Sequence, residues 1–283
     1  MGDAADLALA IEATRAAVAL ALRHFHDQSE WWEKSPGNPV GIADLEVDAY
    51  LKSALLGARP NDGWLSEETA DTDARLTKRR VWVVDPIDGT RDFVRGRTGW
   101  AVSVALIEDG IVTVAALAAP ARQQLFTAAS GQGAMCNGVP LCIADLPTLA
   151  GVRLPMDAAN LSAPFWPSPW PGEVVEKPNS LALRMAKLAS GEADAWLEGR
   201  TIAEWDVAAS ALILTEAGGM VTDRHGAPLA FNKPAPVFHG IAAAGAAIHT
   251  EVLARLDHAM QVFAARRVMA AATGAGSAEH PAA

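Results

Sequence analysis

The acidic residues of this chain gather in four short segments, each beside an apolar run. They are GIADLEVD with Asp44, WLSEET with Glu67 and Glu68, DPIDGT with Asp85 and Asp88, and EWDVAAS with Asp206. Removing a carboxylate from water is costly, so a group of buried acids needs a compensating cation. Oxygen ligands suit hard ions, and no set of His and Cys residues has the spacing of a zinc site. The sequence therefore predicts a site for Mg²⁺, with Mn²⁺ as the alternative ion.

The segment VWVVDPIDGT, residues 81–90, ends an apolar run in two acids three positions apart. If residues 81–84 form a strand, Pro86 should end its ladder because proline has no N–H, and the chain should turn so that Asp88 returns beside Asp85. Gly89 and Thr90 then follow at a turn or helix start, where backbone N–H groups face an anion and glycine permits close approach. This arrangement predicts phosphate as the anion.

Other acid- and phosphate-binding motifs do not fit this spacing. A calcium hand needs acids at its first, third and fifth positions, and phosphotransferases with an aspartyl nucleophile have the second acid two residues on. The chain also lacks a glycine-rich Walker loop. A solvated turn at the end of a strand would explain one such motif alone. It does not explain the three further acidic segments.

Hydrophobic periodicity outlines the elements that must position these acids. Helices are expected over about Leu7–Phe25 and Ala43–Leu56, and strands follow in a largely antiparallel meander. The expected strands are Val81–Val84, Trp100–Ile107, Ile111–Ala118 and Gln124–Ala128. Ala163–Gly172, rich in Pro and Trp, predicts a long surface loop whose Trp residues serve packing. Later helices are expected over Ser180–Ala189, Asp206–Ala217 and Ala246–Ala264.

These elements predict a layered α/β (α+β) sandwich, in which an antiparallel sheet with two covering helices precedes a smaller second sheet with its own helices. The predicted division is an N-terminal metal-binding α+β domain over 1–145, a C-terminal α/β domain over 146–265 and a low-complexity tail over 266–283. The metal site should lie between the two halves.

Composition limits the function classes. The 283 residues carry a net charge of −10, which argues against a nucleic-acid polymer as partner because such binding needs clustered Lys and Arg. Cys136 and Cys142 are too few for a disulfide framework, and the acidic N-terminus does not read as a signal peptide. No apolar run reaches the roughly 20 residues that span a bilayer. We therefore expect a cytoplasmic protein without a membrane partner.

Together the motifs resemble a known family. The order ADLEVD, LSEE, DPIDGT and WDVAAS resembles the inositol monophosphatase superfamily of lithium-sensitive, magnesium-dependent phosphatases, over roughly Leu7–Leu256. The resemblance implies a monoesterase that uses a metal-activated water, two or three Mg²⁺ ions and no covalent enzyme intermediate. Its partner would be a small phosphorylated substrate, and because relatives commonly form dimers a homodimer is also an expectation.

The resemblance also implies roles for individual residues. The metal ligands would be Glu67, Asp85, Asp88, Asp206 and the backbone carbonyl of Ile87. Gly89 and Thr90, with Asp88, would hold the phosphate, and Thr90 and Glu67 would position the attacking water. Asp44 matches a further aspartate of the family that lies near the site.

Substrate identity depends on the surroundings of this site. Arg91 in the RDF sequence after Thr90, and the form of LSEE, resemble the CysQ-type 3'(2'),5'-bisphosphate nucleotidases, which implies adenosine 3',5'-bisphosphate as substrate and AMP as product. Arg91 or Arg184 would then hold the second phosphate. Two positions depart from that pattern, because Ala182 stands in place of a lysine and Gly41 in place of a threonine. Glu198 falls near the position of a sugar-hydroxyl-binding glutamate in inositol phosphatases.

Three hypotheses follow. The first is the bisphosphate nucleotidase, and the second is a phosphatase of inositol phosphate, another sugar phosphate or histidinol phosphate. The third is a non-catalytic protein that binds metal or phosphate on the same fold. The presence of both the metal-binding acids and the water-positioning pair Glu67 and Thr90 argues against the third.

Overall fold

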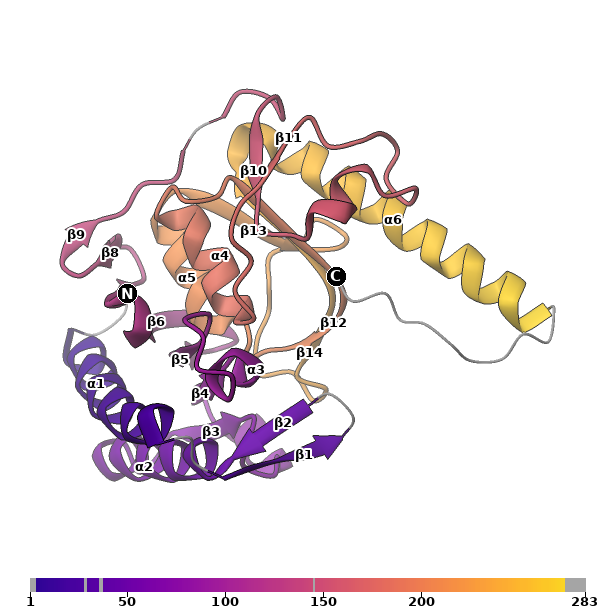
Figure 1. The fold of residues 1–283 in the computed structure, drawn as a ribbon. Helices are drawn as coiled ribbons and strands as arrows, with labels where there is room; N and C mark the ends of the chain where they lie inside the picture. The colour runs from indigo at the N-terminus through magenta and orange to yellow at the C-terminus, as the bar shows by residue number, and fades with distance from the viewer. Residues whose placement is uncertain (1–3, 28–29, 36–37, 145, 273–283) are drawn as a thin grey trace.

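The chain folds into alternating layers of helix and sheet (Figure 1). The computed structural model describes residues 4–27, 30–35, 38–144 and 146–272. Helices α1 (Ala4–Asp27) and α2 (Ile42–Ala58) cover one face of a seven-stranded sheet. Helices α4 (Leu181–Ala189) and α5 (Ala208–Glu216) separate that sheet from a three-stranded one, whose outer face carries α6 (Ala246–Ala272). The predicted layered fold is confirmed.

The seven-stranded sheet has the order β3-β4-β5-β6-β7-β8-β9. Its strands are β3 (Gly63–Ser66), β4 (Arg80–Asp88), β5 (Ala101–Glu108), β6 (Ile111–Ala119), β7 (Gln124–Ala129), β8 (Ala134–Cys136) and β9 (Val139–Pro140). Only the β3–β4 pair is parallel, so the expected antiparallel meander is confirmed. Trp82 and Val84 face α1 and α2, whereas Val81 and Val83 face the opposite core. Because both faces are covered, these strands read as continuous apolar runs.

The three-stranded antiparallel sheet has the order β12-β14-β13. Its strands are β12 (Ala195–Ala203), β14 (Val237–Gly245) and β13 (Gly219–Asp223). Two small sheets complete the strands, a hairpin of β1 (Trp31–Ser35) with β2 (Asn38–Gly41) and a parallel pair of β10 (Val152–Leu154) with β11 (Gly172–Val174). The short helices are α3 (Thr90–Phe93) and the 3₁₀ turns Asp73–Thr77, Pro120–Arg122 and Ala158–Ser162.

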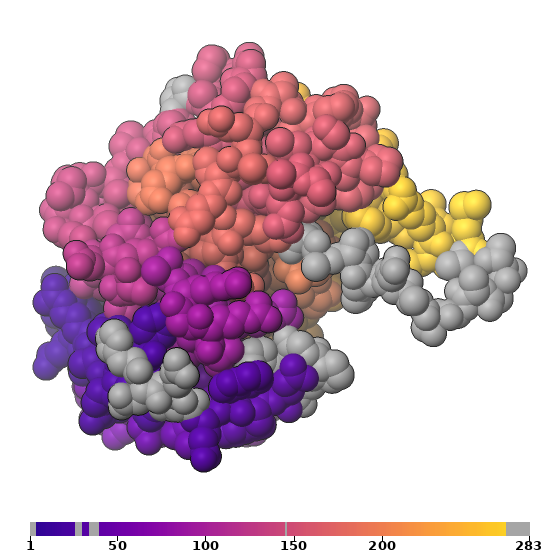
Figure 2. All heavy atoms as spheres, viewed as in Figure 1, coloured from indigo at the N-terminus to yellow at the C-terminus, as the bar shows by residue number. Residues whose placement is uncertain are grey.

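Three details differ from the sequence-based expectations. Strand β4 does not end at Val84 but continues through Pro86 to Asp88. Helix α5 begins only at Ala208, so Asp206 lies in the turn before it. Helix α6 continues to Ala272 and its end projects from the body of the molecule (Figure 2), so the start of the segment 266–283 is helical. Residues 273–283 of that segment lie outside the described residues.

The Pro- and Trp-rich segment 163–172 is a loop, as predicted, and it packs on α6. The Phe165 and Phe263 rings make a tilted contact with centroids 4.9 Å apart, and the Arg255 guanidinium lies 4.5 Å above the ring of the buried Trp170. These Trp and Phe side chains therefore hold the loop against the helix. Among the described residues, none of the helices combines the length and apolar character needed to cross a bilayer.

One buried cluster joins the first sheet to the later elements. Val83 of β4 and Leu117 of β6 belong to the same core as Leu183 of α4 and Ile213 of α5. Burial of such side chains contributes about 1.5–3 kcal/mol each. The edge of the first sheet is thereby fixed against the N-terminal ends of α4 and α5, where the acidic segments meet. The boundary expected at residue 145 remains a prediction, and residue 145 lies outside the described residues.

Candidate metal centre

A β-bulge in β4 places two acids on the same face of the sheet. Asp85 pairs with Ser103 of β5 and Asp88 pairs with Ala101, so three steps along β4 match two steps along β5. In a regular strand, residues three apart point to opposite faces, and one extra residue reverses that relationship. The expectation that Pro86 ends the strand is therefore wrong, although its missing N–H fits the bulge.

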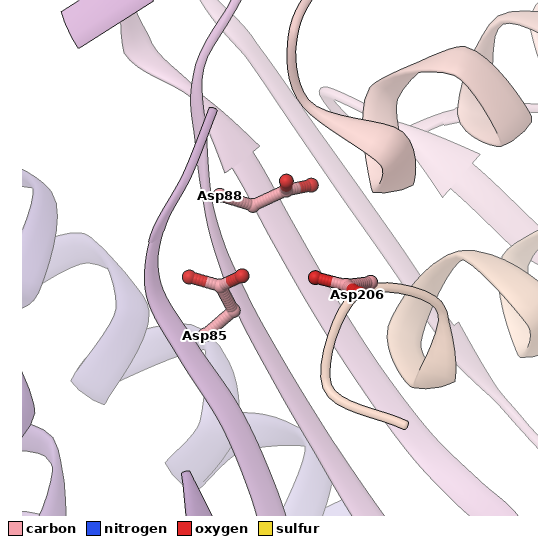
Figure 3. Close-up of side chains that lie close together, drawn as sticks. All are labelled: Asp85, Asp88 and Asp206. Carbon is pink, nitrogen blue, oxygen red and sulfur yellow. The ribbon is translucent and has the colours of Figure 1, made fainter. Parts of the chain in front are cut away.

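The carboxylates of Asp85, Asp88 and Asp206 form the centre of the site. Each offers an oxygen, and these three oxygens lie within 4.8 Å of one another. Figure 3 shows the three side chains close together, Asp85 and Asp88 from β4 and Asp206 from the turn before α5. The sequence predicted these acids as ligands of one site, and the fold brings together Asp88 and Asp206, which are 118 positions apart in the chain.

Nearby bases offset the charges of this triad only in part, because Arg184 acts on Asp88 and Arg200 acts on Asp206. Burial raises the pKa of Asp85 well above its ordinary value, and the neighbouring carboxylates of Glu67, Asp88 and Asp206 raise it further. Burial, followed by the charges of Asp88 and Glu67, likewise raises the pKa of Asp206. Buried like charges at this spacing are favourable only when a cation joins them. The donor set consists of oxygens, which fits Mg²⁺ or Mn²⁺.

The Asp88 side chain also caps the N-terminus of helix α4. Its Oδ2 accepts hydrogen bonds from Ser180 Oγ at 2.5 Å and Ala182 N at 2.8 Å, and its Oδ1 accepts from Leu181 N at 3.1 Å. Burial raises the pKa of Asp88 to about 6, although these hydrogen bonds oppose the shift. A carboxylate at a helix N-terminus satisfies free N–H groups and is favoured by the helix dipole. Asp88 therefore links β4 to α4 as well as contributing to the triad.

Glu67 approaches the triad from the end of β3. Because β3 and β4 are parallel, their carboxyl ends meet at the same edge, with Ser66 opposite Val84. Glu67 N donates to Val84 O at 3.4 Å, and the half-buried Glu67 carboxylate is close enough to raise the pKa of Asp85. It is not one of the three carboxylates within 4.8 Å. The fold thus brings Glu67 to the rim of the centre.

Gly89 forms the turn that follows the bulge. Its φ of +90° lies in the left-handed region, and an added Cβ would lie 2.6 Å from Gly99 O and 2.8 Å from Ser180 N. Only glycine fits both constraints. Gly89 precedes α3, so Thr90 and Arg91 stand in the first turn of that short helix. The sequence predicted this turn correctly.

Asp44 and Thr90 meet beside this turn. Thr90 Oγ1 lies 3.3 Å from Asp44 Oδ1 and 3.0 Å from Ile87 O, so one hydroxyl proton faces two acceptors. Gly41 N donates to Asp44 Oδ2 at 2.8 Å at the start of α2. Burial raises the pKa of Asp44 to about 7, and the charges of Glu68 and Glu67 add to this effect. The fold therefore brings Asp44, Thr90 and the Ile87 carbonyl together.

The basic candidates lie in different surroundings. Arg184 is buried on α4, where its Nε donates to Pro178 O at 2.7 Å, and it lies within electrostatic reach of Glu198 and Asp88. Arg91 is exposed on α3. Glu198 is buried on β12 and accepts from Arg200 N, Nε and Nη2 at 2.8–3.1 Å. Burial would raise the pKa of Glu198, but the Arg200 guanidinium outweighs it and the pKa is lowered.

Sequence reasoning missed three residues beside the site. Ser180 joins Asp88 to α4, and a serine before a helical apolar pattern was the available signal. Arg200 forms an ion pair with Glu198 at an irregular part of β12, where a bulge follows Glu198. The sequence does not show where this bulge lies, so it did not indicate the pair. Ser103 lies buried opposite Asp85, and its hydroxyl has no hydrogen-bond partner among the described residues. Only the strand register could reveal Ser103.

Most of the chain matches a known protein family. Residues 4–261 match the model of the inositol monophosphatase family. The chain belongs to the inositol monophosphatase family. An IMPase from Thermotoga maritima has the same fold, with a TM-score of 0.77 and 26% identity over 90% of this chain and 98% of that one. This member is accordingly a phosphatase, and Mg²⁺ dependence is general to the family.

Curated relatives of this family member carry several names. An inositol-1-monophosphatase of Mesorhizobium japonicum is 32% identical over 68% of this chain and 75% of its own length. A histidinol-phosphatase of Mycobacterium tuberculosis is 33% identical over 77% and 85%. A Streptomyces griseus protein named glucose-1-phosphate thymidylyltransferase is 35% identical over 78% and 86%. Different names on similar chains mean that similarity alone does not assign the substrate.

Proposed function

We propose that this protein is a Mg²⁺-dependent phosphomonoesterase for a small phosphorylated polyol, with an inositol phosphate as the type substrate. The observation that carries the proposal is the convergence of Asp85, Asp88 and Asp206 within 4.8 Å. The relative named inositol-1-monophosphatase adds support. Bound Mg²⁺ would supply charge neutralisation at the phosphate and an acidified water.

The residues of the chain divide the remaining work. Asp85, Asp88 and Asp206, with Glu67 at their rim, would hold the ions, and the Gly89 turn would receive the phosphate. Thr90 would orient the attacking water, and its hydroxyl is itself held by Asp44 Oδ1 and Ile87 O. Asp44 would accept the proton that Thr90 passes on. Preorganised contacts of this kind lower the barrier because they need no rearrangement during the reaction.

A second candidate is the 3'(2'),5'-bisphosphate nucleotidase. The observation that favours it is the basic group beside Asp88 and Asp206, where Arg184 is buried and the Arg200 side chain remains 47% exposed. If bound cations occupy Asp88 and Asp206, the two guanidiniums beside Glu198 would suit a substrate with a second anionic group. The same balance is unfavourable for the cationic amine of histidinol phosphate.

One assay separates these substrates. Phosphate release is measured from inositol 1-phosphate, fructose 1,6-bisphosphate, adenosine 3',5'-bisphosphate and histidinol phosphate, with Mg²⁺, with EDTA and with added Li⁺. We expect Mg²⁺-dependent release, inhibited by Li⁺, with the highest kcat/KM on the inositol ester. A preference for the adenosine compound that Arg200→Gln abolishes would establish the second candidate instead. Mg²⁺ and phosphate binding without hydrolysis of any ester would overturn both.

A further inference from the structure

Asp48 lies one helical turn after Asp44 on α2, and both side chains are buried. Residues four apart share one face of a helix. Asp44 uses that face to contact Thr90, whereas Asp48 contacts the segment that carries Glu67. One helix face therefore contacts two parts of the candidate site that are separate in the sequence.

Asp48 binds residues on both sides of Glu67. Ser66 Oγ donates to Asp48 Oδ1, and Thr69 Oγ1 donates to Asp48 Oδ2 at 2.6 Å. Both carboxylate oxygens are thus used, one before and one after the Glu67–Glu68 pair. Two hydroxyl donors on one carboxylate fix the side chains of Ser66 and Thr69 relative to α2.

Two further contacts extend this connection. Trp64 Nε1 donates to Thr69 Oγ1 at 3.2 Å, and Glu68 N donates to Ser66 Oγ at 3.4 Å. The segment 64–69 is therefore closed on itself around the Asp48 carboxylate. We call this group of Asp48, Trp64, Ser66 and Thr69 the Asp48 clamp. None of its members belongs to the acidic triad.

The position of Glu67 is electrostatically unfavourable without an ion. Glu67 N donates to Val84 O at 3.4 Å, and Val84 directly precedes Asp85, so the Glu67 side chain starts beside the acidic triad. Repulsion would move an unrestrained loop outward, and each ion bound would then have to draw it back. That reorganisation would reduce the affinity for the ion.

We propose that Asp48 is a positioning residue that holds Glu67 at the rim of the triad before the metal arrives. The inference rests on the proposed function, in which Glu67 is a metal ligand. Asp44 and Asp48 would then fix the phosphate turn and the Glu67 segment to the same rigid helix. Residues behind a metal ligand commonly change metal affinity by about 10- to 100-fold when they are replaced.

Replacement of the clamp residues tests this role. Asp48→Asn and Thr69→Val weaken the connection, and Thr69→Ser retains the hydroxyl. As a control away from the site, Thr215→Val removes the hydroxyl of an exposed residue that donates to Ala211 O within α5. Calorimetry measures Mg²⁺ binding without substrate, and an assay measures the Mg²⁺ concentration for half-maximal phosphate release. We expect Asp48→Asn and Thr69→Val to weaken Mg²⁺ binding by about 10-fold or more. The KM for substrate at saturating Mg²⁺ should stay unchanged.

The remaining variants decide between positioning and stability. Thr69→Ser and Thr215→Val should bind Mg²⁺ like the wild type, whatever their melting temperatures in EDTA. If Thr69→Val and Asp48→Asn lower the melting temperature but leave Mg²⁺ affinity unchanged, Asp48 only stabilises the fold and the inference is overturned. Should Asp48→Asn not fold, the comparison of Thr69→Val with Thr69→Ser decides.

Failure of the proposed function gives a different result. A wild type that binds Mg²⁺ but hydrolyses no ester would refute the phosphatase proposal. The Mg²⁺ affinities of the Asp48 and Thr69 variants would still test the positioning role of the Asp48 clamp. A wild type that binds no Mg²⁺ would refute both proposals.

Discussion

Asp85 and Asp88 face the same side of the sheet because a bulge lies between them in strand β4. Three residue steps along β4 are paired with two steps along β5. This single backbone irregularity converts two acids that would diverge into neighbours. Asp206, from the turn before α5, completes the group. The site is therefore built from one irregular strand and one helix start, held by the core between them.

Asp85→Asn should separate stability from function. The amide keeps the shape of the side chain but removes one of the buried like charges, so the metal-free protein should melt at a higher temperature than the wild type. Loss of a ligand oxygen should lower phosphatase activity by about 100-fold or more, since metal contacts contribute several kcal/mol. Melting in EDTA and kcat/KM with Mg²⁺ measure the two effects. Asp109→Asn, at an exposed ion pair, is the control and should change neither.

Gly89→Ala should abolish activity through the backbone. The new methyl group would lie 2.6 Å from Gly99 O at a φ of +90°, so the turn that we propose receives the phosphate must shift. Gly96→Ala is a matched control, because Gly96 also has a positive φ of +64° but has open space where a Cβ would lie. It should lose about 1 kcal/mol of stability and retain activity. Equal activity of the two variants would contradict the role of the turn.

Asp6→Ala should reduce stability without affecting chemistry. The Asp6 carboxylate is fully buried, accepts a hydrogen bond from Arg59 Nε at 2.8 Å and forms an ion pair with Arg80 Nη2 at 2.9 Å. Its removal takes away an acceptor shared by two partly exposed guanidiniums, although Arg80 keeps Asp62 and Glu108 as partners, so the cost should be about 1.5–3 kcal/mol. Asp109→Ala, which breaks an exposed pair with Arg79, should cost less than about 1 kcal/mol. Urea unfolding of both variants checks the difference, and a small effect of Asp6→Ala would refute it.

His249 should make stability depend on pH. Burial lowers the pKa of His249 below its ordinary value, and its Nε2 lies 3.2 Å from Thr222 Oγ1. The unfolded chain therefore takes up a proton at a higher pH than the folded one, so stability should fall as the pH drops below about 6.5. His249→Gln should lose that part of the slope. Free energies of unfolding at pH 5.5 and pH 8 for both proteins measure it, and parallel pH profiles would exclude the contribution.

The sequence by itself determined the ingredients of this protein. The order of ADLEVD, LSEE, DPIDGT and WDVAAS indicated the family and the oxygen-rich site. Hydrophobic periodicity indicated the layered fold, because helices and strands leave repeating patterns among neighbouring residues. It placed Gly89 correctly at a turn, since glycine before a helix start has a local physical meaning. It also identified the three carboxylates that converge.

Tertiary structure decided how those ingredients meet. The bulge at Pro86, the use of Asp88 by α4 and the pairing of Glu198 with Arg200 depend on strand register and on packing between distant segments. Asp48 belongs to the motif ADLEVD, yet its contacts with Ser66 and Thr69 depend on how α2 packs on the segment 64–69. Such contacts join residues far apart in the chain, and no local pattern encodes them because their free energy comes from the assembled core.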